Sequence, residues 1–202
     1  MGILTAMTSQ DGSPEDSART GSGTKGGSSY SGPDEDKPTP RFVVQRHDAS
    51  TLHFDFRLEV DGVLVSWSIP KGPSLDPRDK RLAIRTEDHS LDYLEFEGRI
   101  GDGYGAGTVI VWDIGDYRNR TQRGGADVPP DEAVDEGHLS FWLEGHKLRG
   151  GFALTRVGSP GGREHWLLVK RRDEAADRRR KPTTTQLESV LTGRTNDDLA
   201  DS

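Results

Sequence analysis

The chain has 202 residues, of which 31% are apolar, 30% are charged and 25 are glycines, with a net charge of −7. This apolar fraction is low for a chain that folds throughout, so we expect one domain with segments outside its core. The absence of cysteine excludes disulfides, thiolate metal ligands and a cysteine nucleophile, and the negative charge argues against a protein that coats nucleic acid by bulk electrostatics.

The first 40 residues are rich in Gly, Ser, Asp, Thr and Pro, so we expect a disordered tail over 1–40. From Phe42 onward, short apolar alternations separated by Gly and Pro predict successive strands. These predicted strands are 42–46, 52–60, 63–69, 81–87, 94–100, 107–113, 139–144, 151–157 and 165–171. Many short strands at close spacing indicate a barrel or a sandwich.

Two short helical segments are expected, at 131–137 and 185–192, and neither is long enough to cover a parallel sheet. The domain is expected to span 41–172, followed by a flexible, basic and Thr-rich tail over 173–202. No apolar run reaches the length of a membrane span, and the N-terminus lacks the features of a secretory signal. We therefore expect a cytoplasmic protein without a membrane partner.

The segment from Leu52 to Val60 alternates apolar and polar residues without a break. Because successive side chains of a strand point to opposite faces, its apolar residues share one face. His53, Asp55, Arg57 and Glu59 share the other face.

His47 ends the preceding predicted strand, where a short connection would bring it beside His53 and Asp55. Two imidazoles and one carboxylate form a three-ligand site with open positions, which suits Mn²⁺, Fe²⁺ or Zn²⁺. The alternative is that both histidines are ordinary surface residues, and spacing alone leaves it open.

Arg57 lies on the same predicted face as the ligands, and its planar fork suits a phosphate, although a salt bridge is the alternative. His89 and Tyr93 follow the predicted strand 81–87. A histidine titrates near neutral pH and can protonate a leaving oxygen, whereas the alternative here is a loop histidine that caps a turn.

These residues belong to blocks that resemble the 3′-phosphoesterase domain of bacterial DNA ligase D. The blocks are FVVQRHD at 42–48, LHFDFRLE at 52–59, WSIPKGPS at 67–74, EDHSLDY at 87–93, YGAGT at 104–108 and WLLVK at 166–170. The resemblance covers about 41–172 and implies an all-β fold, a compact small β-barrel whose groove holds Mn²⁺ and the 3′ end of a primer strand.

The resemblance also implies roles for individual residues. His47, His53 and Asp55 correspond to the metal ligands, with other divalent metals as alternatives to Mn²⁺. Arg57 and His89 correspond to contacts with the scissile phosphate, with Tyr93 nearby. The supporting polar positions of the groove correspond to Gln45, Ser66, Lys71, Arg81 and Glu87.

The family removes a terminal 3′ ribonucleoside and then the remaining 3′ phosphate, which leaves a 3′ hydroxyl that a ligase can seal in non-homologous end joining. The implied partners are nucleic acid 3′ ends and a DNA ligase or Ku-type end-joining protein. Family members with the first activity carry an Arg- and Lys-rich segment before the domain, whereas residues 21–40 are Gly, Ser, Pro and acidic here.

The GDGY segment at 101–104 lacks the glutamate expected beside its tyrosine. Because no polymerase or ligase module accompanies the domain, we expect a stand-alone form.

Two functions other than the phosphoesterase are also considered. One is a metal-dependent oxygenase with the same ligand triad, and the other is a non-catalytic module that binds DNA ends beside a ligase.

Overall fold

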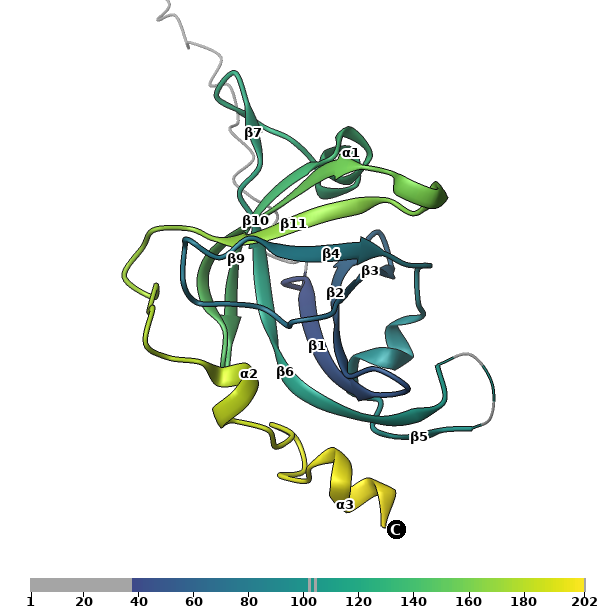
Figure 1. Ribbon diagram of the computed structural model, residues 1–202. Coiled ribbons are helices and arrows are strands. Elements are labelled where there is room, and N and C mark those ends of the chain that lie inside the picture. Colours follow the sequence, from purple (N-terminus) through teal and green to yellow (C-terminus); the bar gives the residue numbers. More distant parts are fainter. Residues whose placement is uncertain (1–37, 102, 104, 202) are drawn as a thin grey trace, which may run out of the picture. The chain divides into compact units, whose positions relative to one another are not determined.

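The computed structural model describes residues 38–101, 103 and 105–201 (Figure 1). Most of the tail expected over 1–40 lies outside the described residues. The described strands are β1 (Arg41–Asp48), β2 (His53–Val60), β3 (Val63–Ile69), β4 (Arg81–Arg85), β5 (Gly98–Ile100), β6 (Gly107–Asn119), β7 (Gln122–Arg123), β8 (Ala126–Asp127), β9 (His138–Gly145), β10 (Arg149–Gly158) and β11 (His165–Lys170). The described helices are η1 (Leu91–Glu95), α1 (Pro130–Glu136), η2 (Pro160–Gly162), α2 (Pro182–Thr185) and α3 (Asn196–Ala200).

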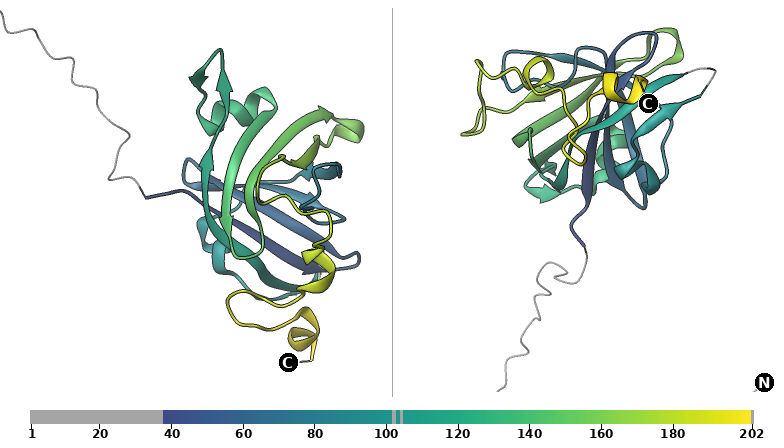
Figure 2. Two further views of the ribbon diagram at one scale, coloured as in Figure 1. Left: turned by 90° about the vertical axis from the view of Figure 1, so that its left-hand side faces the viewer. Right: turned by 90° about the horizontal axis from the view of Figure 1, so that it is seen from below.

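The strands close into an antiparallel barrel, which confirms the expected all-β fold. In the described part of the chain, one sheet has the order β1-β2-β3-β4-β11-β10-β9-β6-β5, and β6 also pairs with β1. This last pairing closes the ring, while β5 extends the β6 edge as a short flap (Figure 2). Closure leaves no long free edge on the sheet, which removes a template for aggregation.

The interior of the barrel is apolar, as the alternation of β2 predicts. Phe56 and Leu58 are fully buried there, and they pack in one cluster with Trp67, Phe141 and Trp166. Aromatic side chains bury the most area per residue, so these rings supply much of the hydrophobic stabilisation. The polar residues of β2 consequently face outward from the barrel.

One part of the outer face is also covered. Val43 of β1 and Leu64 of β3 point away from the interior and pack with Leu94 of η1. The backbone of Leu64 exchanges two hydrogen bonds with that of His89, at 2.8 and 3.0 Å. These contacts hold the segment between β4 and β5 against the outer wall of the barrel, directly beside the polar face of β2.

The C-terminal segment differs from the expected flexible tail, because residues 171–201 follow the barrel surface (Figure 2). The indole nitrogen of Trp112 donates to the Gln186 carbonyl at 2.6 Å, and the Val190 amide donates to the Val111 carbonyl at 3.0 Å. The expected helix at 185–192 is absent from the described residues, where α2 ends at Thr185. Backbone contacts of this kind leave no apolar pattern in the sequence, so the sequence does not indicate that this segment packs on the barrel.

The helix expected at 131–137 corresponds to α1, which ends at Glu136 and is capped by Gly137 with a left-handed φ of 87°. That conformation suits glycine, which has no Cβ to clash with the backbone. No helix among the described residues is long and apolar enough to cross a membrane.

Candidate metal centre and phosphate site

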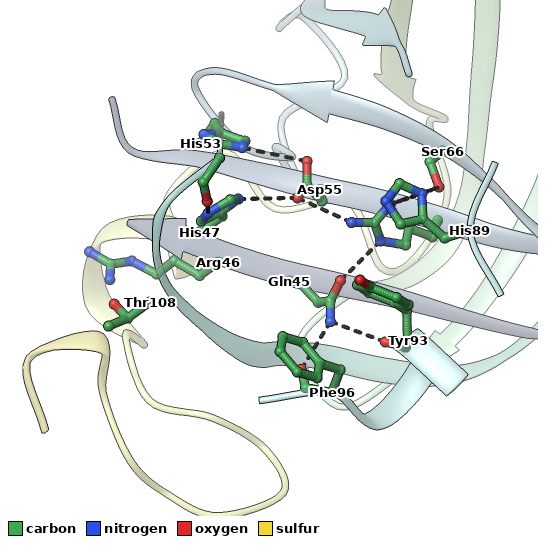
Figure 3. Close-up of polar contacts among 12 residues, drawn as sticks. Gln45, Arg46, His47, His53, Asp55, Ser66, His89, Tyr93, Phe96 and Thr108 are labelled. Carbon is green, nitrogen blue, oxygen red and sulfur yellow. Dashed lines mark hydrogen bonds and ion pairs between the residues drawn. The ribbon is translucent and has the colours of Figure 1, made fainter. Parts of the chain in front are cut away.

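Two neighbouring strands bring the predicted metal ligands together on the outer face of the barrel. In the β1–β2 ladder, His47 lies opposite His53, and Gln45 lies opposite Asp55. The ligand atoms of His47, His53 and Asp55 all lie within 4.8 Å of one another. The two carboxylate oxygens of Asp55 face the imidazoles, at 3.5 Å from His47 Nδ1 and 3.6 Å from His53 Nε2 (Figure 3).

Backbone carbonyls orient both imidazoles from behind. His47 Nε2 lies 2.8 Å from the Gly105 carbonyl oxygen, and His53 Nδ1 lies 2.9 Å from that of Thr51. A carbonyl only accepts, so each of these nitrogens carries the proton and donates it. The lone pairs of His47 Nδ1 and His53 Nε2 are then left facing Asp55, which is the arrangement that metal-binding histidines adopt.

Asp55 is poised as an anionic ligand. Burial by itself raises its pKa, but the neighbouring His47 imidazole and the positive charge of Arg57 outweigh burial and hold the pKa below its ordinary 3.8. The carboxylate is therefore ionised at neutral pH. Two imidazole nitrogens and one carboxylate fit a divalent transition metal, and the residues present match that donor set.

Arg57 connects the candidate metal triad, which consists of His47, His53 and Asp55, to the rest of the site. Its Nε donates to Gln45 Oε1 at 2.9 Å, and its Nη1 donates to Ser66 Oγ at 2.9 Å. Nη1 also lies 2.9 Å from His89 Nδ1, while Nη2 donates to Asp55 Oδ2 at 3.3 Å. Burial lowers the pKa of Arg57, although the Asp55 carboxylate opposes this effect. The guanidinium is thus fixed at each of its three nitrogens.

Gln45 holds Arg57 in place and joins the wall formed by β1 and β2 to η1. Its side-chain amide donates to the carbonyl oxygens of Tyr93 and Phe96, both at 3.0 Å, and only 1% of Gln45 is exposed. Its side-chain oxygen accepts the hydrogen bond from Arg57 Nε. The residue therefore sets the distance between the β1–β2 wall and the segment that carries His89 and Tyr93.

His89 and Tyr93 form the outer side of the site. Their rings pack edge to face with centroids 5.0 Å apart, and the Arg57 guanidinium lies 5.8 Å from the centre of the Tyr93 ring. Burial and the charge of Arg57 lower the pKa of His89 below its ordinary 6.5, despite a contact between Nδ1 and the Glu87 carbonyl at 2.9 Å. His89 is accordingly neutral at pH 7.

Three of the predicted groove residues have other surroundings. Lys71 is exposed in the turn after β3, and Arg81 pairs with Asp79 Oδ2 at 2.8 Å. Glu87 has an exposed side chain and meets His89 through its backbone carbonyl. In the described part of the chain, none of these three side chains has a hydrogen bond or ion pair to the metal triad. Their roles toward substrate stay predictions.

Sequence reasoning missed the backbone groups of the site. The carbonyls of Thr51 and Gly105 have no sequence signal, because every residue carries one. Arg85 contacts the site only through the backbone, because it donates to the Ser66 carbonyl at 3.2 Å.

A family model described as the DNA ligase D 3′-phosphoesterase domain matches residues 45–156, which is more than half of the chain. The chain belongs to this family. All residues of the metal triad and of the Arg57 network lie within the matched part, whereas the C-terminal segment 171–201 lies beyond it.

Three curated relatives of this 3′-phosphoesterase domain are multifunctional non-homologous end joining proteins named LigD. The chain is 53% identical to that of Pseudomonas aeruginosa over 137 residues, which cover 67% of the chain and 16% of the relative. It is 39% identical to that of Mycolicibacterium smegmatis over 136 residues, covering 66% and 17%. It is 41% identical to that of Mycobacterium tuberculosis over 134 residues, covering 66% and 16%. The chain therefore spans about a sixth of the length of these relatives.

Proposed function

We propose that this domain is a Mn²⁺-dependent phosphoesterase that removes the 3′ phosphate from nucleic acid ends and leaves a 3′ hydroxyl for ligation. The observation that carries this proposal is the direct bonding of Arg57 to both the metal triad and His89. Membership of the 3′-phosphoesterase family and the end-joining relatives support it. The proposed partners are nucleic acid 3′ ends and a DNA ligase or Ku-type end-joining protein.

A bound divalent metal would supply positive charge to the phosphate oxygens and activate a nucleophile. His47, His53 and Asp55 would hold it, and the carbonyls of Gly105 and Thr51 already orient the two histidines. Imidazole and carboxylate ligands also accept Fe²⁺ and Zn²⁺. The choice of Mn²⁺ is part of the proposal.

Arg57 is suited to bind a phosphate because it is charged, buried and already ordered. Of its five N–H groups, Nε and Nη1 are directed to Gln45, Ser66 and His89, and one on Nη2 is directed to Asp55. One N–H of Nη2 is left, next to the metal ligand. A preorganised donor in a partly buried site stabilises developing charge without reorganisation.

His89 is suited to contact the same phosphate or its leaving oxygen. In the neutral ring Nδ1 accepts from Arg57 Nη1, which leaves the proton on Nε2, and Nε2 is the nitrogen left for substrate. The ring is neutral before substrate binds, and a phosphate dianion beside it would raise its pKa. Such a histidine can hold or transfer a proton during hydrolysis.

The test is release of inorganic phosphate from a primer–template that ends in a 3′ phosphate. We expect release with Mn²⁺ and none in chelator, and we expect it to be lost in His53→Gln. His138→Gln is the matched control, because His138 is an exposed histidine of β9 that contacts Thr155 and Ser140 instead.

The outcomes separate the competing functions. If the parent protein binds the primer–template with Mn²⁺ but releases no phosphate, the end-binding module replaces the enzyme. Metal-dependent oxygen consumption without phosphate release would favour the oxygenase. Equal activity in His53→Gln and His138→Gln would show that the triad is not the metal site.

A further inference from the structure

Asn196, at the start of α3, ties together two strands that flank His47. Its side-chain amide donates to the Arg46 carbonyl at 3.2 Å, the Thr108 carbonyl at 2.7 Å and Thr108 Oγ1 at 3.1 Å. Its oxygen accepts from Arg46 Nη1 at 2.5 Å. Asn196 is only 1% exposed, so water does not compete for these bonds.

Both partners of Asn196 are adjacent to the metal triad. Arg46 directly precedes His47, and Thr108 lies opposite Asp48 in the β1–β6 ladder. In Figure 3, Arg46 and Thr108 lie on the side of His47 away from Asp55. Asn196 therefore fixes the end of β1 and the start of β6 at the point where His47 is presented.

Thr108 also leads to the carbonyl that orients His47. Three residues before it, the Gly105 oxygen accepts from His47 Nε2. Between them, Gly107 packs so closely on β1 that an added Cβ would lie 2.1 Å from the Asp48 oxygen. This close backbone contact holds the short segment between Gly105 and Thr108 against the end of β1.

A second contact connects α3 to the same flap. Arg99 of β5 donates from Nη1 to the Ala200 carbonyl at 2.8 Å, which joins the end of α3 to the strand on the other side of Gly105. Thr195 and Asp198 form a reciprocal capping box at the start of the helix. The short helix is thus stabilised at both ends, with Asn196 directed inward between them.

We propose that Asn196 is a positioning residue for the metal centre, and that the C-terminal segment braces His47 through Arg46, Thr108 and Gly105. This inference rests on the metal triad of the proposed function. It assigns a role to a residue that lies outside the part of the chain matched by the family model. His53 provides an internal reference, because its orienting carbonyl belongs to Thr51 in the β1–β2 turn.

The experiment compares Asn196→Ala with Asn119→Ala. Asn119 lies at the other end of β6, where its amide donates to the Val128 carbonyl at 2.6 Å and its oxygen accepts from the Thr121 amide at 3.0 Å. Both variants lose a bridging carboxamide at an end of β6. Only Asn196→Ala loses one beside His47.

Two readouts are used, and neither needs catalysis. The first is the Mn²⁺ dissociation constant, measured by electron paramagnetic resonance on the full chain. Loss of a group that orients a metal ligand lowers affinity by about 10–100-fold, so for this more distant residue we expect about tenfold. The second is the imidazole ¹H–¹⁵N spectrum of the metal-free protein. There the His47 signals should shift or broaden in Asn196→Ala, and those of His53, whose ring lies 4.6 Å from that of His47, should change less.

An unchanged Mn²⁺ affinity and an unchanged His47 signal in Asn196→Ala would overturn the proposal, as would equal changes in Asn119→Ala. If Asn196→Ala does not fold, Asn196→Asp provides the test. Aspartate keeps the size and the acceptor for Arg46 but lacks the amide donors, and the same two changes are expected. A parent protein that binds Mn²⁺ but releases no phosphate would refute the proposed function alone, because these readouts are independent of activity.

Discussion

Replacing Arg57 with lysine removes the fork that joins the metal triad to His89 but keeps the positive charge. Three nitrogens of Arg57 contact Gln45, Ser66, His89 and Asp55 at 2.9 to 3.3 Å. A lysine has a single nitrogen and cannot occupy the three positions of the guanidinium. Arg57→Lys therefore separates geometry from charge.

The expected loss follows from the number of contacts. At least two of the hydrogen bonds disappear, and each buried acceptor that is left without a partner costs about 1–3 kcal/mol of folding free energy. Removing one preorganised donor from an active site typically lowers kcat by about 10²–10³-fold, or about 2.7–4 kcal/mol. We expect a fall of that size in 3′-phosphate release, together with a smaller loss of stability.

The assay is the rate of phosphate release from a 3′-phosphate primer–template at saturating Mn²⁺. Arg156→Lys is the control, because Arg156 donates to Glu164 at 2.9 Å and to the Asp135 carbonyl at 3.0 Å, with its guanidinium 5.7 Å from the centre of the Trp166 ring. It should retain the parent's rate. Parental activity in Arg57→Lys would show that charge alone suffices and would refute this reasoning.

Three further predictions concern the C-terminal segment, pH and substrate choice. Asp173→Ala leaves the fully buried Lys170 ammonium without its carboxylate, which lies 2.5 Å away. The free energy of unfolding, measured in urea, should fall by about 3–5 kcal/mol. Parental stability would show that this pair does not anchor the C-terminal segment. Because the folded pKa of His89 lies below 6.5, the unfolded chain binds its proton first as pH falls, so stability should decline from about pH 7 toward the folded pKa. Urea unfolding at about pH 7.5 and about pH 5.5 should show a smaller decline in His89→Gln than in the parent, and an equal decline would contradict the assignment. Because residues 21–40 lack an Arg- and Lys-rich segment, a 3′-phosphate primer should be processed faster than a primer with one 3′ ribonucleotide, and equal rates measured side by side would contradict this.

The barrel and the face of its key strand could be predicted because they depend on a period of two. The alternation from Leu52 to Val60 placed Phe56 in the core and Asp55 on the opposite face, and the structure confirms both positions. The strand expected at 63–69 has the bounds of β3. A one-residue shift would have moved every side chain to the wrong face, so the pattern specifies the register strongly.

The C-terminal segment could not be predicted, because its contacts use backbone groups and single buried residues. Trp112 and Lys147 both donate to the Gln186 carbonyl, and no property of a glutamine residue signals this. The basic run around Arg179 is typical of a solvated tail. Its charge therefore predicts a flexible segment, although Asp173 before it and Gln186 after it both bond to the barrel. The same limit applies to Asn196, whose partners lie 88 and 150 residues away.

The candidate site was predictable as a set of side chains and not as a bonded network. His47, His53 and Asp55 were expected to meet because strand pairing places them side by side, and their ligand atoms lie within 4.8 Å. The link through Gln45 to the carbonyls of Tyr93 and Phe96 depends on how η1 packs on the barrel. That packing is a tertiary contact, and strand periodicity carries no information about it.

The most direct test of the account is an anomalous difference map at the manganese absorption edge. Crystals would be grown with Mn²⁺ and an oligonucleotide that ends in a 3′ phosphate. We predict one peak enclosed by His47 Nδ1, His53 Nε2 and the Asp55 carboxylate, with the 3′ phosphate between the metal and Arg57. A peak elsewhere, or a 3′ phosphate bound away from this triad, would contradict the proposed function.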